Sequence, residues 1–273
     1  MVVFPNAKIN IGLQVLSKRD DGYHDICSLL YPIGLADALE AIPGPDKSLT
    51  KFTSSGIDIP GSADSNICLK AIELIRKEYP VPPLQIHLHK HIPVGAGLGG
   101  GSSDGASMIT LLNKRFELGL SWGEMHHYAR QLGSDCSFFV NNRPALVTGR
   151  GDEIESLAFN LSGYSLVLVY PPIHISTKDA YSMVIPEKSG FDLEGFLISN
   201  TPETWEGKVR NDFELPVLKR YPEIAAIKNK LYAKGGLYVS MSGSGSSVFG
   251  LFKQAPCLKK EFPDCFVWEE TFI

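Results

Sequence analysis

The feature that most constrains the fold of this chain is the segment of residues 95–101, which contains five glycines in seven positions. Ser102 and Ser103 follow at once, and the spacing of Ala106 and Ile109 predicts a helix that begins at one of these serines. Because glycine lacks a Cβ, consecutive N–H groups can turn toward one point, and a helix N-terminus adds partial positive charge there. The sequence therefore predicts a loop that binds an anion, with phosphate as the usual occupant and a tight turn or flexible linker as the alternative.

A nucleotide is a suitable phosphate ligand, but three common nucleotide-binding motifs do not fit. Gly95, Gly97 and Gly100 satisfy the dinucleotide pattern G-x-G-x-x-G, and Glu117 lies near the distance expected for a ribose-binding acid. That pattern should follow a near-continuous apolar strand, whereas the strand predicted here is amphipathic and ends in Pro93. The Walker sequence and the catalytic triplets of protein kinases are absent. The sequence therefore still predicts nucleotide binding, but not through any of these three motifs.

Composition and charge exclude several other classes of protein. The 273 residues carry a formal net charge of −4 and no block of lysine or arginine, so a nucleic-acid partner is not expected. No apolar run approaches the roughly 18 residues that span a bilayer, and the first residues do not resemble a secretion signal. We therefore expect a cytoplasmic protein with no membrane partner. Five cysteines without a Cys-x-x-Cys pair argue against a disulfide framework and against a zinc site.

Alternation and helical periodicity together predict a chain of mixed α and β structure. Strands are expected at residues 7–16, 84–92, 164–170, 237–241 and 248–252. Helices are expected after Asp64 and Ser65, between Ser121 and Gly133 with a capping box formed by Ser121 and Glu124, and near residues 177–185 and 221–233. A turn at residues 149–152 and the strand that follows it indicate two domains that meet near residue 155.

Three segments resemble the motifs of the GHMP family of small-molecule kinases. Residues 93–103, PVGAGLGGGSS, fit the family's second motif, a proline followed by G-x-G-L-G-[GS]-S-S and a helix. Residues 5–24 and 241–250 fit the first and third motifs, in the right order and at suitable distances. The resemblance implies an α+β fold of two domains, with the active site between them. Residues 1–155 would form an ATP-binding domain like domain 2 of ribosomal protein S5, and residues 156–273 a ferredoxin-like domain.

The same resemblance implies that ATP is the co-substrate and that Mg²⁺ accompanies it. The residues that it implies for ATP binding are Pro93, Val94, Gly95, Ala96, Gly97, Leu98, Gly99, Gly100, Gly101, Ser102, Ser103, Gly243, Ser244 and Gly245. Small departures occur at Gly105, Cys136 and Ser137, where the family more often has alanine, valine and proline. None of these departures removes a functional group.

The acceptor site is implied by a more specific part of the resemblance. The first motif contains Lys8, Asn10 and the run DDGYH, and the segment GSDCSFF surrounds Asp135. Both are similar to family members that phosphorylate the 2-hydroxyl of a cytidine diphosphate-linked methylerythritol. The resemblance implies that Lys8 and Asn10 point at the acceptor alcohol and that Asp135 is the catalytic acid beside Lys8. It also implies that His24 binds the edge of cytosine, that Tyr23 and Tyr181 stack on its faces, and that Ser176 and Thr177 contact the substrate.

The residues alone leave other interpretations open. Lys8 and Asn10 lie two apart on a strand and are compatible with an ordinary solvated face, and Asp135 with a helix cap. Tyr23 and His24 are compatible with surface positions. Within the family, kinases of mevalonate, homoserine or a sugar are the rivals, and a non-catalytic nucleotide-binding module is the alternative from another class.

A cluster of histidines is the one other pattern that could indicate a ligand site. His87, His89 and His91 alternate along a predicted strand and could share a face. They have no acidic or cysteine partner nearby in the sequence, so we expect a solvated strand face and no protein-held metal there.

Overall fold

The computed structural model describes residues 1–44, 49–61 and 66–273. The chain divides into two compact units, the first made of Met1–Ala7, Ile33–Val94 and Gly99–Arg143, and the second of Lys8–Pro32, Gly95–Leu98 and Pro144–Ile273. Strands and helices occur in both units, so the predicted mixture of α and β structure is confirmed. In the described part of the chain, no helix has the length and apolar character needed to cross a bilayer.

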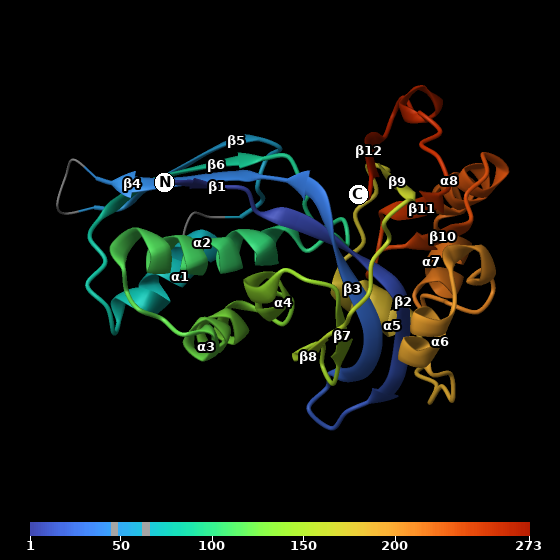
Figure 1. Ribbon diagram of the computed structural model, residues 1–273, viewed down its shortest axis with the longest axis horizontal. Coiled ribbons are helices and arrows are strands. Elements are labelled where there is room, and N and C mark those ends of the chain that lie inside the picture. Colours follow the sequence, from blue (N-terminus) through green and yellow to red (C-terminus); the bar gives the residue numbers. More distant parts are fainter. Residues whose placement is uncertain (45–48, 62–65) are drawn as a thin grey trace. The chain divides into compact units, whose positions relative to one another are not determined.

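The first unit is a mixed sheet with helices on one side. Its strands are β1 (Val2–Val3), β4 (Ala38–Pro43), β5 (Lys51–Gly56) and β6 (Leu84–Lys90), in the order β1-β4-β6-β5, with only the β5–β6 pair parallel. Its helices are α1 (Ile67–Arg76), α2 (Gly100–Phe116), α3 (Trp122–Leu132) and α4 (Cys136–Asn141). Figure 1 shows α1 and α2 running along one face of this sheet. The glycine-rich loop therefore connects a strand of the sheet to a helix that covers it.

The local sequence explains the alternating burial within β6 and the first residues of helices α1 and α3. In β6 the residues Leu84, Ile86 and Leu88 are buried, as the period of two predicts. The predicted capping box of α3 is confirmed, since Ser121 and Glu124 bind each other's backbone N–H groups. The predicted caps Asp64 and Ser65 lie outside the described residues. Asn66 caps α1 by accepting a hydrogen bond from the N–H of Cys68.

The second unit contains two sheets. One has the order β10-β11-β9-β12 and is antiparallel, with strands β9 (Ser165–Tyr170), β10 (Tyr238–Met241), β11 (Val248–Phe252) and β12 (Phe266–Thr271). The other has the order β2-β3-β7-β8, with strands β2 (Asn6–Lys18), β3 (His24–Ala36), β7 (Ala145–Thr148) and β8 (Glu153–Ser156). The ends of β2 and β3 extend into the first unit. The predicted turn at residues 149–152 connects β7 and β8.

The connections of the first of these sheets are those of a ferredoxin-like domain. Helices α5 (Thr177–Met183), α6 (Leu193–Ser199), α7 (Glu214–Arg220) and α8 (Pro222–Ala233) separate β9 from β10. A hairpin then joins β10 to β11, and β12 returns beside β9. Between β11 and β12 a single 3₁₀ turn, Lys259–Glu261, occupies the place of the second helix of such a domain.

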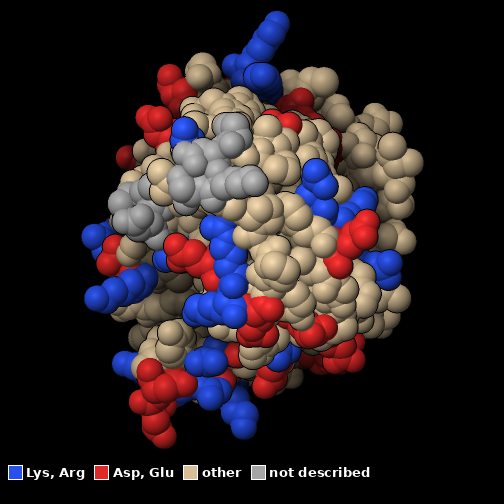
Figure 2. Space-filling view, turned by 90° about the vertical axis from the view of Figure 1, so that its left-hand side faces the viewer, with Lys and Arg blue, Asp and Glu red and all other residues tan. Residues whose placement is uncertain are grey.

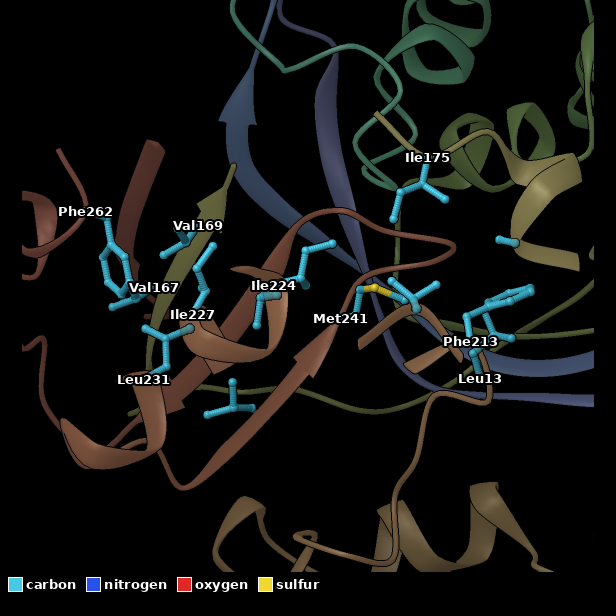
Figure 3. Close-up of a cluster of buried hydrophobic side chains, with 14 of the residues drawn as sticks. Leu13, Val167, Val169, Ile175, Phe213, Ile224, Ile227, Leu231, Met241 and Phe262 are labelled. Carbon is cyan, nitrogen blue, oxygen red and sulfur yellow. The ribbon is translucent and has the colours of Figure 1, made fainter. Parts of the chain in front are cut away.

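The core of this domain forms between α8 and the sheet. Ile224, Ile227 and Leu231, spaced at three and four residues on α8, pack against Val167 and Val169 of the mostly buried strand β9 (Figure 3). The same cluster extends to a second group of buried side chains: Leu13 of β2, Ile175, Phe213 and Met241. The loop that follows Met241 therefore starts from a residue that is packed in this core.

The face of the protein drawn in Figure 2 carries charges of both signs. Acidic and basic side chains lie next to one another there, among larger areas of uncharged residues. This mixture agrees with the small net charge of −4 over the whole sequence.

Candidate functional site

The glycine-rich loop has a backbone that side chains other than hydrogen rarely adopt. Gly95, Gly97 and Gly99 have φ angles of +68°, +77° and +69°. Gly99 is the N-cap of α2, and it makes no side-chain capping bond because it has no side chain. The helix therefore begins at Gly100, and the predicted start at Ser102 or Ser103 was wrong by two or three residues. The error arose because serine is the commoner cap, whereas here a left-handed glycine turns the chain into the helix.

Carbonyl groups of this loop accept hydrogen bonds from the protein, whereas its N–H groups donate to none of the described residues. The carbonyl oxygen of Gly97 accepts hydrogen bonds from the Ser242 hydroxyl at 2.8 Å and from Lys8 Nζ at 3.2 Å. The carbonyl of Leu98 accepts the N–H of Lys8 at 3.0 Å. Among the described residues, no hydrogen bond uses the N–H groups of residues 95–102. The loop and the first turn of α2 thus offer a row of donors to a ligand, as an anion site requires.

The second glycine-serine loop lies against the first. A Cβ on Gly97 would be 2.1 Å from the carbonyl oxygen of Ser242, which is too close for any side chain. Gly243 and Gly245 also have positive φ angles, of +55° and +90°. The two loops therefore meet backbone to backbone, and only glycine at position 97 permits this approach.

Lys8 and Asn10 point to the same side of β2 and are both 4% exposed. Lys8 Nζ donates to Asn10 Oδ1 at 2.5 Å, and Asn10 Nδ2 donates to the Ser28 hydroxyl at 2.9 Å. The N–H of Asn10 donates to Ser242 Oγ at 3.3 Å. The plainer interpretation of an ordinary solvated strand face is therefore wrong. A buried ammonium in a polar network is suited to stabilising negative charge on a ligand.

His24 and Tyr181 form a stacked pair. Their ring centroids are 4.7 Å apart and their planes differ by 19°. Phe213 packs its edge against Tyr181, with centroids 4.8 Å apart and planes at 89°. Burial and the nearby charge of Lys18 lower the pKa of His24 below its usual value. Its imidazole is therefore neutral at pH 7 and presents one donor and one acceptor nitrogen.

Tyr23 lies apart from this pair in its contacts. Its side chain is 60% exposed, and the Arg150 guanidinium lies over its ring, 5.1 Å from the centroid. Asp21 accepts a hydrogen bond from the N–H of Tyr23 at 3.1 Å and faces Arg150 at 4.0 Å. Arg150 belongs to the GRGD turn, which sequence analysis had interpreted only as a turn. An exposed aromatic ring backed by a cation is a surface on which a base can stack.

Asp135 stands directly before α4 and is half-buried, and its side chain makes no capping hydrogen bond to that helix. Helix α4, which begins at Cys136, packs against α2. Asp135 therefore occupies the N-cap position of α4 without the side-chain hydrogen bond of a capping aspartate. Ser176, by contrast, is a true cap, because its hydroxyl accepts the N–H of Asp179 at 3.0 Å at the start of α5. Thr177 is exposed.

A buried ionic cluster lies below the start of α2, and sequence analysis missed it. Lys90 Nζ contacts Asp37 Oδ2 at 2.5 Å and Asp104 Oδ2 at 2.6 Å, and all three side chains are at most 3% exposed. Asp37 also accepts the N–H groups of His91 and Ile92, the residues that lead into the loop. Burial raises the pKa of Asp104 to about 7, against the opposing effect of Lys90. Burial lowers the pKa of Lys90, but the two carboxylates outweigh it and the net shift is upward.

The predicted histidine face has partners of another kind. His87 lies between Thr53 and Ser55, at 2.9 Å from each hydroxyl, and Ser55 also contacts Nδ1 of His89 at 3.0 Å. Within the described ranges, no group of three or more His, Cys, Asp or Glu side chains is arranged to hold a metal.

Two segments of the chain match models of one protein family. Residues 66–143 match the model of the GHMP kinase N-terminal domain, and residues 197–257 match that of the GHMP kinase C-terminal domain. A curated relative in Cytophaga hutchinsonii is 48% identical over 257 residues, which cover 94% of each chain. The chain belongs to the GHMP kinase family. It is therefore a phosphotransferase that uses ATP as co-substrate, and the two-domain α+β fold implied by the motifs is confirmed.

Two curated relatives of this GHMP kinase share one name. The Cytophaga hutchinsonii protein and one from Parabacteroides distasonis, 45% identical with 98% of each chain covered, are both called 4-diphosphocytidyl-2-C-methyl-D-erythritol kinase. The solved structure of a 4-(cytidine 5′-diphospho)-2C-methyl-D-erythritol kinase is 29% identical, with a TM-score of 0.83 and coverage of 100% and 99%. A homoserine kinase from Cytophaga hutchinsonii, 16% identical over 98% and 94% of the two chains with a TM-score of 0.70, shows the fold alone.

Several polar residues of this GHMP kinase were not found by sequence analysis. Ser28 and Ser242 complete the network of Lys8 and Asn10, and Asn211 and Glu214 bind the segment around Met241. No local pattern in the sequence indicated these residues, because each of them binds a segment that is distant along the chain. The roles assigned to individual site residues stay predictions.

Proposed function

We propose that this GHMP kinase transfers the γ-phosphate of ATP to the 2-hydroxyl of 4-diphosphocytidyl-2-C-methyl-D-erythritol, a step of non-mevalonate isoprenoid precursor biosynthesis. The observation that carries the proposal is the shared name of relatives that are 45–48% identical over nearly the whole chain. The polar and aromatic residues of the second unit supply the groups that such a substrate needs.

ATP would be held through its phosphates by the two glycine-rich loops. The row of N–H groups at residues 95–102 supports this assignment, because phosphate oxygens accept several amide donors at once. Residues 93–103 and 243–245 would form the nucleotide site. We place the boundary between the ATP-binding and the C-terminal domain at residue 155, between the segments that match the two family models.

The cytidine end of the acceptor would be recognised by aromatic residues. The stacked pair of His24 and Tyr181 offers a flat apolar surface beside a neutral imidazole edge, and both fit a cytosine ring. Tyr23 would provide a second stacking surface, and Ser176 and Thr177 further polar contacts. Binding energy from the base would then orient the distant alcohol for reaction.

The chemical step would rest on three side chains. Asn10 would orient the acceptor hydroxyl, and the Lys8 ammonium would stabilise the alkoxide as it develops. Asp135 would accept the hydroxyl proton as the oxygen forms its bond to the γ-phosphorus, while the bond from that phosphorus to the β–γ bridging oxygen breaks and ADP leaves. The absence of a capping bond at Asp135 supports this role, since its carboxylate is not needed to begin α4.

Mg²⁺ would enter bound to ATP and neutralise charge on the phosphates. Ser102, in the first turn of α2, offers an oxygen donor that fits this ion, because magnesium prefers oxygen ligands, retains several waters and takes few protein groups. Since ATP is a cytoplasmic metabolite, we expect the reaction to take place in the cytoplasm.

A coupled assay of ADP release tests the proposal. The purified chain is given ATP, Mg²⁺ and one acceptor at a time: the cytidine diphosphate-linked alcohol, free 2-C-methyl-D-erythritol, mevalonate, homoserine or galactose. We expect turnover with the first and little with the second, which lacks the base. Turnover with mevalonate, homoserine or galactose instead would contradict the assigned substrate, and no turnover with any acceptor would indicate a non-catalytic nucleotide-binding module.

A further inference from the structure

Asn211 is a buried amide whose hydrogen-bonding groups are all used on the backbone. It is 3% exposed. Its Nδ2 donates to the carbonyl oxygens of Met241 and Gly243, both at 2.8 Å, and its Oδ1 accepts the N–H of Phe213 at 3.0 Å. The two bound carbonyls lie on either side of Ser242. Asn211 therefore fixes the backbone on both sides of that serine.

The three residues after Asn211 hold other segments in place. Asp212 Oδ2 accepts the N–H of Val15 at 2.7 Å, which attaches the segment to β2. Phe213 packs against Tyr181. Glu214 accepts the N–H of Met241 at 2.7 Å and forms an ion pair with Lys228 of α8 at 2.6 Å. The segment of residues 211–214 is thus anchored on several sides, so the amide of Asn211 has little freedom to move.

The serine held in this way connects the two halves of the polar network. Ser242 Oγ donates to the Gly97 carbonyl at 2.8 Å and accepts the N–H of Asn10 at 3.3 Å. Gly97 in turn accepts Lys8 Nζ. A shift of the backbone at Ser242 would therefore move the phosphate loop and the two residues of β2 relative to one another.

We propose that Asn211 is a positioning residue for phosphoryl transfer: by clamping the carbonyls on both sides of Ser242, it holds Gly97 and Asn10 in the register that the reaction needs. Asn211 touches no reacting atom in this scheme and acts through Ser242. The expected loss of kcat rests on the proposed function. The hydrogen bonds of Asn211 do not depend on that function.

The test is Asn211→Asp, with Asn113→Asp as its matched control. In the variant the acceptor for Phe213 remains, but the two donors are replaced by an oxygen that faces two carbonyl oxygens. Asn113 makes a similar clamp away from the loops, since its Nδ2 donates to the carbonyl of Leu120 at 3.0 Å and its Oδ1 accepts the N–H of the same residue at 2.9 Å. Asn113→Asp therefore loses the same kind of bond without affecting Ser242.

We expect Asn211→Asp to lower kcat roughly 10- to 100-fold, at a temperature where both variants are folded, while Asn113→Asp stays within about twofold of the wild type. The kcat of Asn211→Asp relative to the wild type should recover as the pH falls, because a protonated carboxyl group donates a hydrogen bond again. Equal losses of kcat in the two variants would overturn the proposal and leave Asn211 a purely structural residue.

Two further measurements keep the inference testable. If Asn211→Asp does not fold, Ser242→Ala removes the link itself, and a similar loss of kcat supports the proposal while wild-type kcat overturns it. If the wild type shows no turnover with the cytidine-linked alcohol, the proposed function fails. Direct titration with ATP then decides the inference, because weaker binding in Asn211→Asp alone supports it and equal affinities in the two Asn→Asp variants overturn it.

Discussion

The ring of Tyr181 lies stacked on the imidazole of His24, with centroids 4.7 Å apart. The pair joins an aromatic residue from α5 to the first residue of β3, and Phe213 supports it from the side. A surface that is already ordered costs little conformational entropy when a flat ligand binds to it. This relationship makes the pair the best candidate for the site that recognises the base.

Replacement of Tyr181 by alanine should weaken the acceptor far more than ATP. Stacking of a base on an aromatic side chain contributes roughly 1 to 3 kcal/mol, so kcat/KM for the cytidine-linked alcohol should fall about 5- to 150-fold. Steady-state kinetics with each substrate varied in turn measure the effect. Tyr181→Phe keeps the ring and should stay close to the wild type. Equal losses for ATP and acceptor in Tyr181→Ala would refute the assignment of the base site.

Replacement of Gly101 by valine should abolish most of the ATP binding without unfolding the chain. A Cβ at this second position of α2 meets no protein atom within 4 Å, so the added side chain would occupy space next to the row of N–H donors. Gly123 is the second residue of α3, and its Cβ would also meet almost nothing, with Ser121 Oγ at 4.0 Å. Gly123→Val is therefore the control for the helical cost of valine. Titration should show at least about tenfold weaker ATP binding for Gly101→Val alone; unchanged affinity would argue against phosphate at this helix end.

Asp135→Asn should remove catalysis and spare the fold. Asparagine keeps the shape but cannot accept the proton, and general-base assistance contributes typically 10²- to 10⁴-fold, so kcat should fall by about that factor. No capping bond is lost, so the melting temperature should stay near that of the wild type. Asp192 is a true cap, because its Oδ1 accepts the N–H of Gly195 at 3.0 Å, and Asp192→Asn should leave kcat unchanged. An Asp135→Asn enzyme that keeps most of its activity would remove the residue from the mechanism.

Asp104 should make stability depend on pH in the neutral range. Its pKa is raised from an ordinary value of about 4 to about 7, so the folded state binds the proton more tightly than the unfolded chain does. This contribution is fully present below pH 4 and is lost as the pH rises through 7. Urea unfolding of the wild type and of Asp104→Asn should therefore show the wild type losing stability relative to the variant between pH 4 and pH 7. Parallel profiles, or a relative gain for the wild type, would contradict the raised pKa.

Local patterns in the sequence predicted much of the nucleotide loop, since glycine at positions 95, 97 and 99 is required by backbone angles that the chain adopts locally. Strand β6 and the capping box of α3 were predicted for the same reason, because alternation and a four-residue cap are properties of neighbouring residues. Strand β3 was missed as a continuous element, because Pro32 and Gly34 interrupt its pattern and its pairing with β2 and β7 comes from distant segments.

The polar network could not be predicted from spacing. Asn10 and Ser242 are 232 residues apart, and Asn211 binds backbone carbonyls, which carry no sequence signal. The cluster of Lys90 with Asp37 and Asp104 was missed because a lysine at the end of an alternating strand is normally exposed. The polar network and the Lys90 cluster form only when distant segments come together in the folded chain. They fix the position of the glycine-rich loops, whose own sequences could be interpreted.

The central claim, phosphorylation of the 2-hydroxyl of the cytidine-linked alcohol, is tested most directly by the proton-coupled ³¹P NMR spectrum of the product formed with ATP and Mg²⁺. The carbon that bears this hydroxyl also bears the methyl group and has no hydrogen, so a phosphate ester there has no proton three bonds away. The account predicts a new phosphomonoester signal that is an unsplit singlet, together with the intact diphosphate signals of the cytidine moiety and one ADP for each ester formed. A new signal split by neighbouring protons would place the phosphate on another hydroxyl, and the absence of any new ester signal would contradict the proposed activity.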